Sequence, residues 1–111
     1  MGIQKDAGEL LLYIYGKKIS GKETPHPSEF IKETSWEKER ILNALQYLHG
    51  KGLIDGKVIK STGSTKPQFV LIKDISPSGI DVIENEAEFK KTFNFTVNLG
   101  LLSYSWGASE K

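Results

Sequence analysis

Apolar residues recur at helical intervals between Ala7 and Ile14, which predicts a first helix near the start of the chain. Asp6-Ala7-Gly8-Glu9 has the spacing of a capping box, in which Asp6 accepts from the third helical amide and Glu9 bonds back to the amide of Asp6. Gly16 is the residue type that commonly ends a helix in a left-handed turn. We therefore expect the first helix to begin at the capping box and to end at Gly16.

A short second helix is predicted after a lysine-rich connector, residues 17–26. Pro27 suits the first helical position, because the amide hydrogen that proline lacks has no partner there in any case. We expect this helix to reach about Glu33, with Phe30 and Ile31 turned inward.

A longer third helix is predicted over residues 36–49. Thr34 and Glu37 form a second capping box ahead of it, and Gly50 and Gly52 follow its end. Its apolar positions share one face, as the core-facing side of a helix requires. They are Ile41, Ala44, Leu45 and Leu48.

The hydrophobic period changes from 3.6 to 2 after the third helix, which predicts a β-hairpin over residues 53–75. The segment TGSTKP between its two apolar stretches supplies the turn residues. Ser76 then suits an N-cap and Pro77 a first helical residue. We expect a fourth helix from Pro77 to about Lys91, with Ile80, Ile83 and Ala87 on one face.

The last segment, residues 92–111, alternates apolar and polar residues and therefore has the pattern of an amphipathic strand. An exposed strand of this kind promotes aggregation, so we expect it to be covered. It would pair with a sheet edge of its own or a second subunit and contribute to a homodimer, or it would pack on the first or fourth helix. The apolar side of the strand is formed by Phe93, Phe95, Val97, Leu99 and Leu101.

The order of these elements resembles the winged helix-turn-helix superfamily over residues 6–91. The stretch SEFIKETSWEKERILNALQYLHGKGLI is similar to the tandem helices that lead into the wing, and ISPSGIDVIE is similar to the passage from the last wing strand to a final helix. The resemblance implies an α+β domain, residues 1–91, with three helices, a β-hairpin wing and a C-terminal helix, followed by the tail of residues 92–111. In many members of the superfamily the longer helix enters the major groove of DNA and the wing contacts phosphate or the minor groove.

Composition and charge narrow the function classes. A length of 111 residues suits one domain, and the absence of cysteine excludes disulfides, thiolate zinc sites and a cysteine nucleophile. No apolar run approaches a membrane span and the first residues lack a signal peptide, so we expect a cytoplasmic protein. Net charge is +1, and Arg40 is the only arginine among 15 basic residues. Nucleic-acid binding would therefore depend on local lysines, which favour phosphate contact over the reading of guanine.

Candidate DNA-reading residues lie on the face of the 36–49 helix opposite its apolar side. Asn43 and Gln46 suit adenine, and Arg40 at the edge of this face suits guanine or phosphate. Glu39 on the same face would repel phosphate unless it accepts a hydrogen bond from cytosine. The aromatic residues Trp36 and Tyr47 complete the candidate set on this helix.

The wing, residues 57–66, carries no acidic residue and is the second candidate DNA contact. Its ammonium and hydroxyl groups suit phosphate oxygens. An equally acceptable interpretation is a solvated turn whose lysines keep the strand edges soluble. The candidate residues are Lys57, Lys60, Thr62, Ser64 and Lys66.

Two functions follow from these residues. The first is DNA binding by a winged-helix protein that regulates transcription, with double-stranded DNA as its partner. The second is a protein–protein interaction module without DNA binding, favoured by the near-neutral charge and by Trp36 and Tyr47, since aromatics dominate contact hot spots.

Neither catalysis nor a cofactor is expected. The segment GKKISGKET, residues 16–24, comes within one residue of a P-loop, but Glu23 stands where Ser or Thr should hold magnesium, and Pro25 and Pro27 prevent the required helix. His26, which could cap the second helix, and His49 have no acids at metal-ligand spacing around them. We interpret residues 16–24 as a connector that, by resemblance, carries a short strand joining the wing sheet. Lysines that could add phosphate contacts are Lys17, Lys18, Lys22 and Lys32.

Overall fold

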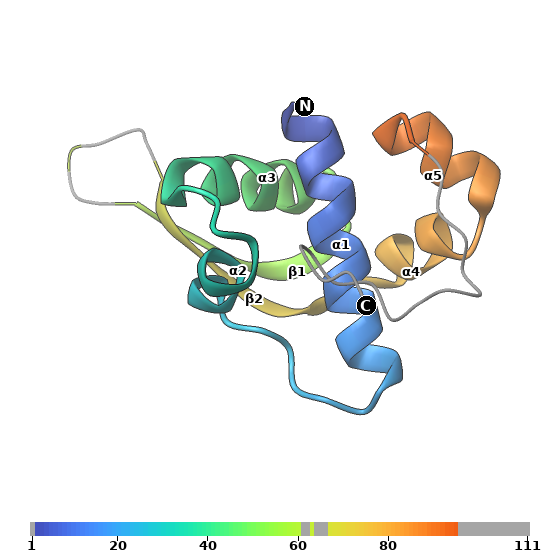
Figure 1. Cartoon of the computed structure of the whole chain (residues 1–111), viewed down its shortest axis with the longest axis horizontal. Coiled ribbons are helices and arrows are strands. Elements are labelled where there is room, and N and C mark those ends of the chain that lie inside the picture. Colours follow the sequence, from blue (N-terminus) through green and yellow to red (C-terminus); the bar gives the residue numbers. More distant parts are fainter. Residues whose placement is uncertain (1, 61–62, 64–66, 96–111) are drawn as a thin grey trace.

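The computed structural model describes residues 2–60, 63 and 67–95. Over these residues the chain is an α+β protein with one antiparallel sheet of two strands, which confirms the predicted fold class at this level. In chain order the elements are α1 (Ile3–Ile19), α2 (Pro27–Thr34), α3 (Lys38–Gly50), β1 (Ile54–Lys60), β2 (Pro67–Ile75), α4 (Pro77–Ile83) and α5 (Glu86–Phe93) (Figure 1).

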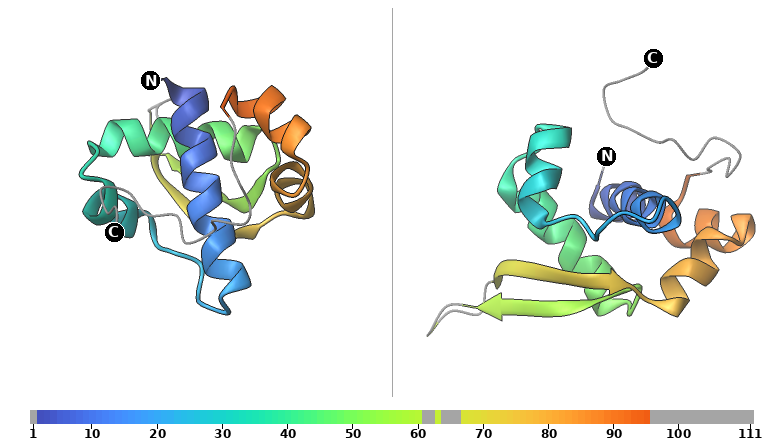
Figure 2. Two further views of the ribbon diagram at one scale, coloured as in Figure 1. Left: turned by 45° about the vertical axis from the view of Figure 1, so that its right-hand side comes forward. Right: turned by 90° about the horizontal axis from the view of Figure 1, so that it is seen from below.

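The core lies where α1, α3 and the hairpin meet. α1 packs across α3, and α3 packs on both strands. In the right-hand view of Figure 2, the strands lie along one side of the molecule, with α1, α2 and α3 all on the same side of the sheet. Each fully buried leucine or phenylalanine in this core contributes about 1.5–3 kcal/mol. The largest of these side chains are Phe30, Phe89, Phe93, Leu10, Leu11, Leu12, Ile14, Ile41, Leu45, Leu48, Ile83 and Val70.

The start of α1 differs from the prediction. The helix begins at Ile3 with Gly2 as N-cap, and the Asp6 amide donates to the Gly2 carbonyl at 2.9 Å. Asp6 therefore lies inside the first turn, and the predicted capping box is wrong. Its carboxylate is buried and bonded to Arg40, so it is used in tertiary packing.

The end of α1 also lies beyond the prediction. The helix continues through Gly16 to Ile19, and the left-handed turn occurs at Gly21, with φ 73°. Lys17 and Lys18 occupy the last turn, where positive charge is favoured by the helix dipole. The residues after it form no strand, so the connector does not join the sheet as the resemblance implied.

α2 begins at Pro27, as predicted, and buries Phe30 completely. Ile31 does not turn inward, because its side chain is 39% exposed on the outer side of this short helix. The Thr34 hydroxyl donates to the Phe30 carbonyl and accepts from the Trp36 amide. Thr34 therefore finishes α2, and the second predicted capping box is also wrong.

α3 starts at Lys38 with Glu37 as N-cap, which leaves Trp36 just ahead of the helix rather than inside it. The predicted apolar face is confirmed, because every one of its residues is buried. α3 ends at Gly50, and Gly52 takes a left-handed conformation with φ 74° before β1 begins.

The predicted hairpin is confirmed, with β1 paired antiparallel to β2. Lys57 lies opposite Leu71 in the register, and Ile59 opposite Phe69. The register shifts next to Gly56, where β2 contains one extra residue, Lys73. A β-carbon at Gly56 would lie 2.0 Å from the Leu71 carbonyl oxygen, so only glycine fits this bulge.

The predicted fourth helix is in fact two helices. α4 ends at Ile83, and the Asn85 side chain accepts from the Glu88 amide to start α5 in a new direction (Figure 1). The change of direction leaves Ala87 exposed, against the prediction, and buries Phe89.

Phe93 is the last residue of α5 and is fully buried, so the extended chain predicted to start there is wrong at this residue. Asn94 follows with φ 65°, and the Phe95 ring lies 5.1 Å from the Phe89 ring. Both Phe93 and Phe95 pack against Gly8 of α1, where a β-carbon would approach each ring to 2.8 Å. The rest of the predicted strand, residues 96–111, lies outside the described residues.

Candidate nucleic-acid interface

α3 and the hairpin occupy one end of the molecule, and α4 and α5 occupy the other (Figures 1 and 2). The N-terminal end of α3 and the ends of the strands that lead into the turn lie on the same side in Figure 1. This arrangement brings together the two segments that the sequence proposed as DNA contacts.

Asn43 and Gln46 are exposed on α3, as predicted. They lie on the side of the helix opposite Ile41 and Leu48, which are buried against α1 and the sheet. Both amides therefore face solvent from a helix whose other side is fixed by packing. A rigid helix that presents polar amides is able to offer donors and acceptors to base edges.

Arg40 has a role that the sequence did not predict. Its Nε and Nη2 lie 2.8 and 3.0 Å from the two carboxylate oxygens of Asp6, which is 4% exposed. Its guanidinium lies 3.9 Å from the centre of the Trp36 ring. The hydrogen bonds to Asp6 raise the pKa of Arg40 above its ordinary value. Because the guanidinium already forms a bidentate pair, contact with guanine would require a costly rearrangement.

Trp36 and Tyr47 are half-buried and pack against the core. The Lys51 ammonium lies 5.8 Å from the centre of the Tyr47 ring. The two aromatic side chains therefore offer a partner less surface than full exposure would provide.

Carboxylates gather at the N-terminal ends of α1 and α3. A hollow of about 320 Å³ separates the two ends. Such acidic lining opposes phosphate, while the N-terminal ends of the helices favour the carboxylates themselves. The hollow is lined by Gly2, Ile3, Asp6, Glu37, Glu39, Arg40 and Asn43.

The hairpin carries Lys57 and Lys60 exposed on β1, and within the described residues neither takes part in a salt bridge. Gly63 adopts φ 79°, a conformation that suits a tight turn. The other predicted wing contacts, Thr62, Ser64 and Lys66, lie outside the described residues.

Two connector lysines do not add the expected positive charge. The Lys17 ammonium lies 3.2 Å from Glu29, and the Lys18 ammonium lies 3.0 Å from Asp74. Glu29 also accepts from the Tyr13 hydroxyl at 2.6 Å, and this hydrogen bond is the main reason why the pKa of Glu29 is lowered. Lys17 and Lys18 therefore tie α1 to α2 and to the base of β2.

His26 caps α2, as the sequence suggested. Its Nδ1 accepts from the Ser28 amide at 3.2 Å, and its ring lies 5.3 Å from that of Phe69. In the part of the chain that the structure describes, no three histidine, aspartate or glutamate side chains group as metal ligands would. Among the same residues, none of the helices has the length and apolarity that crossing a membrane requires.

Comparison with known proteins adds no relative. No protein-family model matches the chain, and neither does any curated protein or solved structure. The functional argument therefore rests on the residues of this chain.

Proposed function

We propose that this chain is a DNA-binding protein of the winged helix-turn-helix type and acts in the cytoplasm as a transcriptional regulator. The observation that supports this most is that α3, on which Asn43 and Gln46 are exposed, and the hairpin, on which Lys57 and Lys60 are exposed, occupy the same end of the molecule. Lysines would bind phosphate, and the amides would contact base edges from a helix laid in the major groove.

Each residue has a separate expected role in this proposal. Lys57 and Lys60 supply affinity without sequence preference, because phosphates repeat along any duplex. Asn43 and Gln46 supply preference for adenine. Arg40 supports α3 by holding it to α1 through Asp6, and it is not proposed to read bases.

Binding of the full chain to a random duplex, measured by fluorescence anisotropy at several salt concentrations, tests the proposal. The logarithm of the association constant should fall linearly with the logarithm of salt concentration. Lys60→Ala should reduce the slope by about one, because it removes one phosphate contact. Lys90→Ala on α5, at the opposite end of the molecule, is the matched control and should leave the slope unchanged. Absence of binding at low salt would refute DNA binding.

A protein-interaction module is the second candidate. It is favoured by Glu37 and Glu39, which place negative charge at the N-terminal end of α3, where DNA phosphates would approach. This candidate predicts no measurable affinity for DNA and a stoichiometric protein partner. Loss of that partner on Glu39→Lys, together with failure of the anisotropy test, would favour it.

Homodimerisation through the tail belongs to either candidate. Phe93 and Phe95 pack within their own chain, so the proposal now depends on residues 96–111. Light scattering on the full chain should give twice the mass of one chain. A monomeric mass at the concentrations that bind DNA would rule out this role.

A further inference from the structure

The outer face of the hairpin is the side of the sheet turned away from α1, α2 and α3 (Figure 2). Two large apolar side chains, Ile59 and Leu71, are each 40% exposed there. They alternate along their strands with Val58 and Val70, of which Val70 is fully buried on the inner face. A solvated outer face would normally carry polar residues at such positions.

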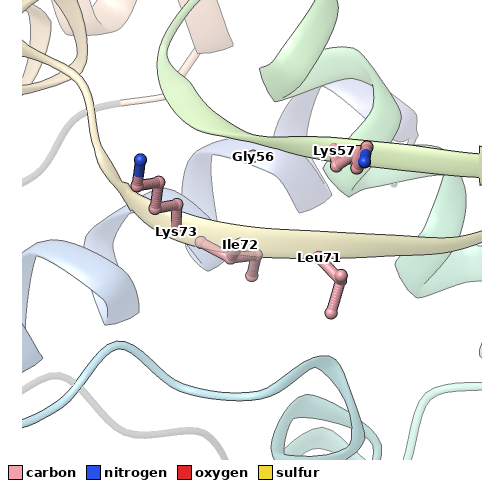
Figure 3. A pocket seen from close by; sticks show the side chains of 5 residues that line it. All are labelled: Gly56, Lys57, Leu71, Ile72 and Lys73. Atoms are coloured by element: carbon pink, nitrogen blue, oxygen red, sulfur yellow. The ribbon is translucent and has the colours of Figure 1, made fainter.

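A groove of about 510 Å³ crosses this outer face (Figure 3). Gly56 contributes no side chain to the groove, and the bulge adds one residue, Lys73, to β2 next to Gly56. Lys57 lies directly opposite Leu71 in the register. The groove is thus an apolar surface bordered by ammonium groups. It is lined by Gly56, Lys57, Leu71, Ile72 and Lys73.

The charge around the groove favours an acidic ligand. Lys57 and Lys73 are exposed at its borders. Of the two aspartates at the base of the hairpin, Asp74 already has Lys18 within 3.0 Å, and Asp55 lies opposite it in the register. With Lys60 further along β1, positive charge exceeds negative charge on this part of the surface.

We infer that the outer face of the hairpin binds an extended, acidic peptide segment of another protein, which lies across the two strands and places apolar side chains over Ile59 and Leu71. A peptide can cover Ile59 and Leu71 with apolar side chains and pair its carboxylates with Lys57 and Lys73, whereas DNA offers no apolar side chains of this kind. Because side chains alternate along an extended peptide, every second peptide residue should face the hairpin. These residues should combine acidic side chains, next to Lys57 and Lys73, with apolar ones. This inference does not depend on the proposed DNA binding.

A selection from a random twelve-residue peptide library against the immobilised full chain tests the inference, with counter-selection on Leu71→Glu. Enriched peptides should carry acidic and apolar residues two positions apart. Their affinity, measured by fluorescence anisotropy, should weaken as salt rises, because lysines contribute to it. No enrichment, or equal enrichment on Leu71→Glu, would overturn the inference.

Matched variants then locate the binding site. Leu71→Glu and Lys73→Glu should each weaken the selected peptide by about tenfold or more, since each removes a contact and places a negative charge in the groove. Ile31→Glu, an equally exposed isoleucine on α2, should have no effect. Lys57→Ala keeps the test decisive if a glutamate variant fails to fold, because loss of one ammonium group leaves the hairpin pairing intact.

Two other occupants of the face are separable outcomes. If Leu71→Glu converts a dimer to a monomer in light scattering, a second copy of the chain covers the face and the peptide inference is wrong. If vesicles of phosphatidylcholine and phosphatidylserine bind the chain through Leu71 and the peptides do not, a membrane surface takes the place of the peptide, and the inference is again wrong.

Discussion

Asp6 and Arg40 form the contact that joins α1 to the N-terminal half of α3. The carboxylate of Asp6 is buried, whereas the Arg40 side chain is 34% exposed and stacks on Trp36. A buried carboxylate that loses its partner must remain desolvated and unpaired or become protonated. The pair is therefore expected to matter more for stability than an ion pair on the surface.

Arg40→Ala is expected to lower the free energy of unfolding by about 2 kcal/mol, because it leaves Asp6 without its two hydrogen bonds. Lys18→Ala, which breaks an exposed pair with Asp74 at 3.0 Å, should cost about 0.5 kcal/mol or less. Urea denaturation of both variants gives the comparison. Equal losses would show that Asp6 is not held in the way the geometry indicates.

Tyr15 predicts a pH dependence. Its hydroxyl donates to Glu84 at 2.5 Å, and this hydrogen bond, with burial as a second cause, raises the pKa of Tyr15 from near 10 to about 12. Since the folded protein favours the neutral phenol, its stabilisation is complete below pH 10 and is lost as the pH rises towards 12. The melting temperature should fall over this window, and Tyr15→Phe should reduce the fall. Tyr13, whose pKa is raised mainly by burial, should retain part of it. An unchanged slope in Tyr15→Phe would contradict the assignment.

At the scale of single residues, the exposure of the polar side chains on α3 could be predicted from the sequence, whereas the partners of side chains could not. The exposure of Asn43 and Gln46 follows from helical periodicity once the apolar side of α3 is known. The pairing of Arg40 with Asp6 spans 34 positions and leaves no periodic signal, so Arg40 was assigned to DNA. The exposure of Ile59 and Leu71 follows from the alternation of strand residues, because Val58 and Val70 on the other face pack against the core.

Ser76 connects several elements at the base of the hairpin. Its hydroxyl donates to the Gly52 carbonyl at 2.6 Å and accepts from the Gly79 amide at 3.0 Å, and its amide donates to the Leu53 carbonyl. It is buried, so water cannot replace these bonds without local opening. One side chain thus caps α4 and holds it to the segment between α3 and β1.

Ser76→Ala should lower the free energy of unfolding by about 1–2 kcal/mol, because it removes the cap of α4 and leaves the buried Gly79 amide without its side-chain acceptor. Asn85→Ala removes only an exposed cap at the start of α5 and should cost about 1 kcal/mol or less. Urea midpoints of the two variants are the measurement. A larger loss in Asn85→Ala would mean that the Gly52 bond contributes little.

Elements were predictable where local pattern and tertiary packing agree. This agreement holds for three features: the start of α2 at Pro27, the apolar side of α3 and the hairpin. Prediction failed where a local signal was overridden. Gly16 is a residue type that often ends a helix, yet α1 continues to Ile19. Lys17 and Lys18 in its last turn form salt bridges with acidic residues on α2 and β2. Asn85 interrupts a pattern that looks continuous, because it can cap a helix in a new direction.

The last aromatic residues that the structure describes, Phe93 and Phe95, pack against the first helix of the chain. Phe93 is fully buried and Phe95 is half-buried, and both contact the flat surface that Gly8 leaves on α1. The Phe89 and Phe93 rings lie 4.9 Å apart. The sequence did not predict this arrangement, because an apolar residue at every second position from Phe93 onward is typical of a strand and not of the end of a helix.

Phe93→Ala should cost about 3–5 kcal/mol, the usual range for removal of a fully buried phenylalanine, and is expected to leave much of the chain unfolded at 37 °C. Phe95→Ala should cost about 1 kcal/mol, because part of that ring is already in water. Thermal melts followed by circular dichroism distinguish the two. A larger loss in Phe95→Ala would place the main contact of the tail beyond α5.

The hydrogen bonds of Ser76 have a consequence for the order in which the chain gains and loses structure. α4 is anchored to the Leu53 segment, and a β-carbon at Gly79 would lie only 2.2 Å from the Leu53 carbonyl oxygen. The last two helices can therefore dock in this position only when the hairpin is closed at its base. Amide protons of Gly79 and Ser76 should exchange with solvent at the rate set by hairpin opening, which makes the C-terminal half of the molecule one cooperative unit.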